Sequence, residues 1–222
     1  MALQIQGNSG VIQEVAGTAF RAAHTHVKPL EYGAFGHYRT SVRFGLVAVQ
    51  AANSRLFEVR NTHATNLIIP TRLSIKWIQT AAHTAAILDS LDFYKLTAFS
   101  VSSTTGTVTP TASIKRAGMA ASPGGAAIRH VTVAGAAAGI TGFTSTKDTN
   151  AAFSIPQMLL LAVPTTGFIQ YAGGDLLDEV NGTHPFVLLQ NEGFLIENRV
   201  LLGAAAGSEV TIDFSWAEVV AF

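Results

Sequence analysis

The chain has 222 residues, no cysteine, and 14 basic against 14 acidic side chains, so its formal net charge is +0. The lack of cysteine excludes disulfide bonds and cysteine-based zinc sites, and a neutral chain without a cluster of lysine and arginine is a poor ligand for nucleic acid or an anionic membrane surface. Only 13% of the residues are charged. This predicts a surface partly covered by other subunits, with a monomer rich in surface serine, threonine and asparagine as the alternative.

Residues 1–30 have no steady hydrophobic period and are predicted to form an N-terminal arm. The first residues lack the basic and apolar regions of a signal peptide, and no apolar run approaches the length of a membrane-spanning helix. We therefore expect a soluble protein that is not exported through a cleaved signal. His24 and His26 would point to the same side of a strand and could share a metal ion, but ordinary polar residues in an arm are the favoured interpretation.

Alternating apolar and polar residues predict strands over Tyr38–Val49, Arg55–Arg60, Leu67–Thr80 and Leu91–Val101. Residues 80–90, TAAHTAAILDS, have the composition of a short helix, with a loop or a bulge as the alternative. This is the one stretch in the chain that resembles a helix by composition.

Residues 102–150 are rich in serine, threonine, glycine and alanine and contain too few large apolar side chains for a core of their own. We interpret them as an elaborated loop-rich insertion, with weak strands at 128–135 and 142–147, in a single domain that spans residues 31–222. Gln157–Val163 is a continuous apolar run, which predicts a central strand buried on both faces. Ile169–Val180 is predicted to be a connection with a short helical turn at DLLDEV.

The C-terminal stretch contains GFLIEN and VTIDFSWAEV, joined by a glycine- and alanine-rich turn. They predict two strands that pair like a hairpin in the core, with Trp216 pointing inward. Asn191, Glu192 and Gly193 predict a bulge or turn in which Gly193 supplies unusual backbone angles. Short strands separated by glycine, proline and asparagine, with almost no helix, predict an all-β protein, an antiparallel β-sandwich or jelly roll.

Motifs for catalysis are missing: the sequence contains no GxSxG, GxGxxG, P-loop or HExxH pattern. Asp175, Asp178 and Glu179 form the one acidic cluster, for which a glycosidase pair is conceivable but a solvated turn is favoured. The aromatic residues could form a sugar-stacking platform, but their positions on alternating apolar faces favour core packing; they are Trp77, Phe99, Phe186, Phe194, Phe214 and Trp216. We therefore predict no catalytic, cofactor-binding or metal-binding residue.

Several segments match one family in the same order: KPLEYGAFGHYRTSV, VQAANSRLFEVRN, IIPTRLSIKW, HPFVLLQNEGFLIEN and VTIDFSWAEV. In these segments the chain resembles a family of tailed-bacteriophage virion structural proteins, from about Pro29 to Val219, with residues 102–150 matching least. The resemblance implies a non-enzymatic capsid decoration or cement protein without a cofactor. It also implies a homo-oligomer, most simply a trimer, that contacts the major capsid protein and belongs to a virion assembled in the host bacterial cytoplasm.

An alternative implied by the same resemblance is a tail, collar or fibre-associated virion protein that binds host carbohydrate. In either case, the N-terminal arm would extend over a neighbouring subunit by adding a strand to its sheet.

Overall fold

The computed structural model describes residues 4–6, 12–14, 37–108, 127–151, 153–154, 158–160, 170–177, 186–204 and 207–219. The chain divides into two compact units, Met1–Glu31 and Tyr32–Phe222. In the first unit, β1 (Gln4–Gln6) and β2 (Ile12–Glu14) form an antiparallel pair. His24 and His26, the two histidines of the predicted arm, lie outside the described residues.

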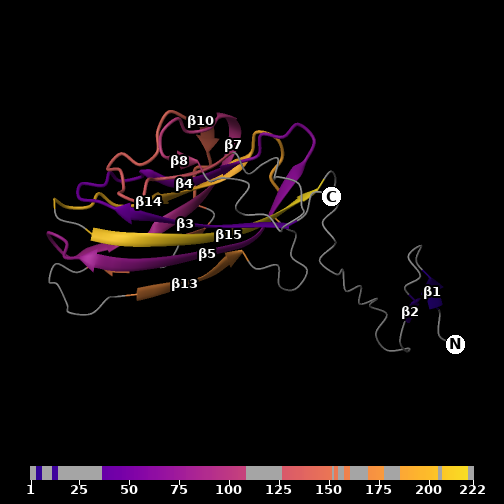
Figure 1. The fold of residues 1–222 in the computed structure, drawn as a ribbon, viewed down its shortest axis with the longest axis horizontal. Coiled ribbons are helices and arrows are strands. Elements are labelled where there is room, and N and C mark those ends of the chain that lie inside the picture. Colours follow the sequence, from indigo (N-terminus) through magenta and orange to yellow (C-terminus); the bar gives the residue numbers. More distant parts are fainter. Residues whose placement is uncertain are drawn as a thin grey trace. The chain divides into compact units, whose positions relative to one another are not determined.

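The larger unit contains a four-stranded antiparallel sheet in the order β13-β5-β15-β3 (Figure 1). Its strands are β3 (His37–Leu46), β5 (Leu67–Ala81), β13 (Gln170–Leu177) and β15 (Gly207–Val219). β15 lies in the middle and pairs with β3 on one side and β5 on the other. Buried and exposed residues alternate strictly from Tyr38 to Phe44, because successive side chains of a strand point to opposite faces and only one face meets the core.

A second, seven-stranded sheet has the order β10-β7-β14-β4-β9-β8, and β11 pairs with β7. Its strands are β4 (Arg55–Arg60), β7 (Leu91–Val101), β8 (Thr107–Val108), β9 (Ile128–His130), β10 (Thr144–Lys147), β11 (Phe153–Ser154) and β14 (Gly193–Asn198). A separate antiparallel pair joins β6 (Ile87–Asp89) to β12 (Met158–Leu160).

Aromatic rings from both large sheets meet in one core. Phe194 of β14 lies 5.4 Å from Phe214 of β15, measured between ring centroids, and Phe57 of β4 lies 6.2 Å from Phe214. Phe214 in turn stacks on Trp216 at 5.0 Å. These contacts between antiparallel sheets are those of a β-sandwich, so the all-β antiparallel prediction is confirmed.

The helical interpretation of residues 80–90 is wrong, whereas the alternative of a loop is confirmed for residues 82–86. None of the elements in the described residues is an α-helix. It follows that no helix in this part of the chain is long and apolar enough to span a membrane. Within 80–90, Ile87–Asp89 forms β6 because its backbone pairs with β12, and a helix this short would not offset its nucleation cost. The DLL of the predicted turn belongs to β13, paired with β5.

The apolar run Gln157–Val163 was predicted to be a central strand. Its described part, Met158–Leu160, instead pairs with β6 in the two-stranded sheet, outside both large sheets. The remaining residues of this run lie outside the described ranges. An unbroken apolar sequence indicates burial of side chains but does not say which strand will supply its hydrogen bonds.

The C-terminal strands do not form a hairpin, contrary to the sequence-based expectation. β14 lies between β7 and β4, whereas β15 lies in the opposite sheet. The connection crosses between the sheets and is held by backbone hydrogen bonds, from Arg199 N to Ser90 O at 3.0 Å and from Leu202 N to Gln50 O at 3.0 Å. The two strands therefore face each other through Phe194 and Phe214 instead of pairing edge to edge.

Gly193 also has a different role from the one expected. The left-handed residue of this turn is Asn191, with φ of 60°, a conformation that asparagine tolerates. Position 193 requires glycine because a Cβ atom there would lie only 2.1 Å from the carbonyl oxygen of Val59. The register irregularity lies further along, between Ile196 and Glu197.

Candidate functional site

Charged residues gather on the face of the seven-stranded sheet that points away from the aromatic core. Phe57 and Val59 belong to that core, so Glu58 between them points to the other face. Ile196 is paired with Phe57 and Glu197 with Arg55, which leaves Leu56 unpaired. The extra residue brings Arg55 onto the same face as Glu58.

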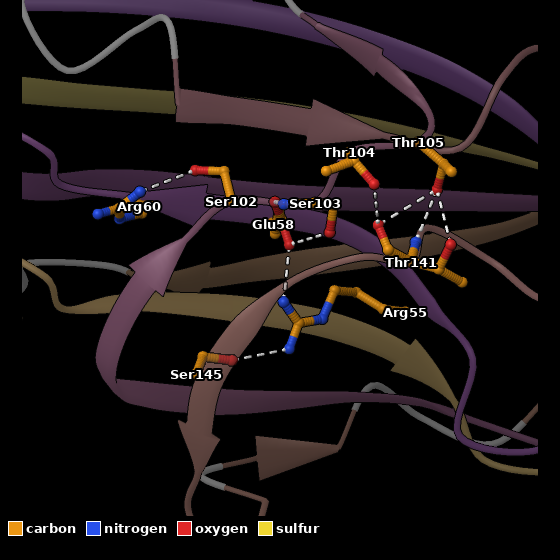
Figure 2. Close-up of polar contacts among 9 residues, drawn as sticks. All are labelled: Arg55, Glu58, Arg60, Ser102, Ser103, Thr104, Thr105, Thr141 and Ser145. Carbon is orange, nitrogen blue, oxygen red and sulfur yellow. Dashed lines mark hydrogen bonds and ion pairs between the residues drawn. The ribbon is translucent and has the colours of Figure 1, made fainter.

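Arg55 and Glu58 form a buried ion pair, with Nη1 and Oε2 2.7 Å apart and side chains 4% and 0% exposed. Glu58 also accepts hydrogen bonds from the backbone N of Ser103 at 2.8 Å and from its hydroxyl at 2.7 Å. Arg55 Nη2 donates to Ser145 Oγ at 3.1 Å. Figure 2 shows the result: one ion pair joins β4 to the segment after β7 and to β10.

The guanidinium of Arg55 is enclosed by aromatic rings. It lies 3.4 Å from the ring centroid of Phe143 and 5.6 Å from that of Phe99. Burial lowers the pKa of Arg55 from its ordinary value, while the hydrogen bond and charge of Glu58 act in the opposite direction. These contacts hold the largely buried cation by dispersion and electrostatics.

A second layer of hydroxyl contacts lies beside this pair (Figure 2). Thr105 Oγ1 accepts a hydrogen bond from Thr141 N at 2.7 Å, and Thr104 N donates to Thr141 O at 2.9 Å. Arg60 Nη1 reaches Ser102 Oγ at 3.4 Å. The threonines are exposed, and their contacts fix two loops to each other.

A cleft of about 330 Å³ opens next to Arg55. Phe143, 41% exposed, forms part of its wall together with Lys147 and Glu197. Lys147 Nζ donates to Glu197 Oε1 at 2.7 Å and lies 4.2 Å from the ring centroid of Tyr94. Burial raises the pKa of Glu197, and the hydrogen bond from Lys147 opposes that shift. Glu197, the carboxylate among the lining residues of the cleft, is thus already paired with a cation.

The residues singled out in the sequence do not converge. Asp175 lies on β13 opposite Ser74 of β5, and Asp178 and Glu179 lie outside the described ranges. His83 and His130 are buried, and burial lowers the pKa of each imidazole. Among the described residues no group of three His, Cys, Asp or Glu side chains could hold a metal ion.

The aromatic residues pack as predicted: Trp77, Phe99, Phe194, Phe214 and Trp216 are all buried, and Phe186 packs against the core while partly exposed. Sequence reasoning missed Arg55 and Glu58. Residues three apart on a regular strand point to opposite faces, and only the register irregularity beside Leu56 places them together. No signal in the sequence marks that irregularity.

Asp89 is a buried carboxylate whose ionisation should be visible in the pH dependence of stability. It is 1% exposed, and its Oδ1 accepts hydrogen bonds from Ser90 N at 2.8 Å and Val200 N at 3.1 Å. Burial is the main cause that raises its pKa from 3.8 to about 6, with a smaller contribution from Asp92. A raised pKa means that the folded state favours the protonated carboxyl group of Asp89. The stability that this protonated group contributes is complete below pH 3.8 and is lost as the pH rises through about 6.

We therefore expect Asp89→Asn, which cannot ionise, to gain stability relative to the parent protein as pH rises from 4 to 8, by up to about 3 kcal/mol. Urea unfolding at several pH values measures the difference. Asp148→Asn, the same change of side chain at an exposed position, is the matched control. A difference for Asp89→Asn that does not change with pH would contradict the expectation.

In comparison with known proteins, no family model matches the chain and no curated sequence matches it.

Proposed function

We propose that this chain is a non-enzymatic structural protein of a tailed-bacteriophage virion, a capsid decoration protein that stabilises the head through contacts between subunits. The proposal starts from the sequence resemblance over residues 29–219. Its segments supply β3, β4, β5, β14 and β15, which contribute most of the aromatic core, while Phe93 comes from β7. The family pattern is thus a pattern of scaffold residues.

The observation that carries the proposal is how the buried charges are used. Arg55 and Glu58 bond to Ser145 and Ser103, so their polar atoms join a strand to neighbouring segments. Lys147, which is 38% exposed, pairs with the buried Glu197 and joins β10 to β14. A catalytic site needs groups available to a substrate. Charged groups that are already hydrogen-bonded to neighbouring segments are typical of a rigid scaffold.

The surface supports an assembly role as well. Only 13% of the chain is charged, and large apolar side chains are exposed at several places: Val49, Leu88, Val101, Val108, Val133, Phe143, Leu189 and Leu201. A neutral and partly apolar surface associates with other proteins without electrostatic repulsion. In this proposal the chain is a jelly-roll homotrimer that contacts the major capsid protein in the virion, with residues 102–150 as an insertion on the scaffold.

One observation favours a second candidate, a tail, collar or fibre-associated protein that binds host carbohydrate. The cleft beside Arg55 contains the half-exposed ring of Phe143 together with hydroxyl and charged side chains. Sugars bind to proteins by stacking on aromatic rings and by hydrogen bonding to paired polar groups. This arrangement would suit a single neutral sugar unit.

The number of copies in an intact particle decides between the candidates. We expect quantitative mass spectrometry of purified virions to find a copy number comparable with that of the major capsid protein. A few copies per particle, in tail fractions, would instead favour the carbohydrate-binding candidate. Purified protein should also co-sediment with capsids that lack it. Failure to bind such capsids, together with absence from purified particles, would refute both.

A further inference from the structure

Strand β3 has an open edge. It is the last strand in the order of the four-stranded sheet, and among the described strands it pairs with β15 alone. Gly45 N donates to Val133 O at 3.1 Å, so this N–H points away from β15. Because the direction alternates along an antiparallel strand, the N–H and C=O groups of Arg39, Ser41 and Arg43 point the same way. No described residue forms a hydrogen bond with these backbone groups on that side.

The open edge of β3 is regular along its whole length. The ten residues from His37 to Leu46 pair with β15 in a continuous register without a bulge, and none of them is proline. The strand at the other side of the sheet, β13, pairs with β5 through two register irregularities. Proteins usually block exposed edges with bulges, prolines or projecting charges. An edge without the first two is suited to accept another strand.

The arginines of this edge reach across the outer face of the sheet. Arg43 pairs with Glu209 of β15, and Arg39 Nη2 lies 3.9 Å from Asp213 Oδ1 on the same strand. Both side chains are therefore directed towards β15 and do not block the edge. Asp213 also faces Lys76 of β5, with Nζ and Oδ2 3.8 Å apart. Three cations thus share two carboxylates, which leaves positive charge in excess beside the edge.

These features restrict what can bind at the edge. Regularly spaced N–H and C=O groups are satisfied together by an extended backbone. The side chains of an added strand alternate between the two faces, so every second one lies beside the arginines, where a carboxylate is favoured. A second copy of β3 does not meet this condition. In the antiparallel register centred on Ser41, Arg39 of each copy would lie opposite Arg43 of the other, and like charges placed opposite each other repel.

We propose that the open edge of β3 accepts an extended segment of a partner protein, in which apolar residues alternate with carboxylate-bearing residues. The added strand continues the row of backbone bonds that Val133 begins at Gly45. Its apolar side chains extend the buried face to which Tyr38, Thr40 and Val42 belong. The inference goes beyond the virion role proposed above and does not depend on it, because it rests on the geometry and charge of one edge.

Two labelled octapeptides serve as probes, one of alternating valine and glutamate and one of alternating valine and lysine. We expect fluorescence anisotropy to show that the full-length protein binds the glutamate peptide at least about tenfold more tightly than the lysine peptide. Amide hydrogen exchange, measured by NMR, locates the binding. The glutamate peptide should protect the amides of Arg39, Ser41 and Arg43. The amides of Thr40 and Val42, which face β15, should be protected with or without peptide.

Ser41→Pro tests the backbone contact directly. It removes the central N–H of the open edge without removing a bond to β15, and it should weaken binding of the glutamate peptide at least about tenfold. Ser41→Ala is the matched control, because it changes the side chain but keeps the N–H, and it should bind like the parent protein. Thermal unfolding shows whether both variants keep the fold. If Ser41→Pro does not fold, the exchange measurement on the parent protein decides.

Equal binding of the two peptides would overturn the inference, as would a glutamate peptide that leaves the exchange of the three outward amides unchanged. Protection of these amides that appears without peptide as the protein concentration rises would overturn the choice of partner, because a second copy of the chain would then occupy the edge.

Discussion

Replacing Glu58 with glutamine is expected to lower the free energy of unfolding by about 3–5 kcal/mol. The substitution keeps the size and one acceptor oxygen, but it removes the negative charge that faces Arg55. Arg55 is 4% exposed and its guanidinium lies against Phe143, so the unpaired cation would remain largely removed from water. An unpaired buried charge is among the largest single costs in a folded protein.

Urea unfolding at neutral pH measures this cost. Glu209→Gln is the matched control, because Glu209 pairs with Arg43, which is 64% exposed. A surface pair of this kind contributes less than about 1 kcal/mol. The double variant Arg55→Met with Glu58→Gln should recover part of the loss, because it removes the orphaned cation as well. A cost for Glu58→Gln as small as that of the control would show that Arg55 is not desolvated in solution.

The strands with the clearest alternation were predictable from sequence. Arg55–Arg60 and Leu91–Val101 have the predicted bounds, and the long strand that begins at Leu67 ends one residue later than expected. Where the alternation holds, one face of the strand packs on the core while the other faces away from it; the exception is Leu56 and Phe57, which are consecutive and both belong to the core. The pattern of apolar residues therefore predicts directly that the segment is a strand.

Strand partners were not predictable in the same way. GFLIEN and VTIDFSWAEV are close in sequence and both extended, which favours a hairpin, yet they lie in opposite sheets. The alternation of a strand fixes which side chains are buried but not which backbone lies next to it. The crossing depends on contacts distant in sequence, such as Leu202 N with Gln50 O, and such contacts leave no local pattern.

The candidate site was missed for a related reason. Arg55 and Glu58 share a face because one unpaired residue, Leu56, shifts the register of β4 against β14. Ser103 and Ser145, which complete the network, come from the serine-rich stretch interpreted as an insertion. Short polar side chains in such a stretch look alike in sequence, and only the fold determines which of them meet a buried charge.

Phe194→Ala is expected to lower the free energy of unfolding by about 3–5 kcal/mol, since it empties the space of a large ring in a packed core. Phe194 is 0% exposed. Its ring centroid lies 4.7 Å from that of Phe93 in the same sheet and 5.4 Å from that of Phe214 in the other sheet. Besides the apolar area, the substitution removes aromatic contacts worth about 0.5–1.5 kcal/mol per pair.

Denaturant unfolding again gives the measurement, with Leu88→Ala as the control. Leu88 is 52% exposed, so its truncation should change stability by no more than about 0.5 kcal/mol. Combining Phe194→Ala with Phe214→Ala should cost less than the sum of the single changes, because both remove the same contact between the sheets. Strictly additive effects would mean that the two strands do not meet at these rings. The two sheets would then have to be joined elsewhere than at Phe194 and Phe214.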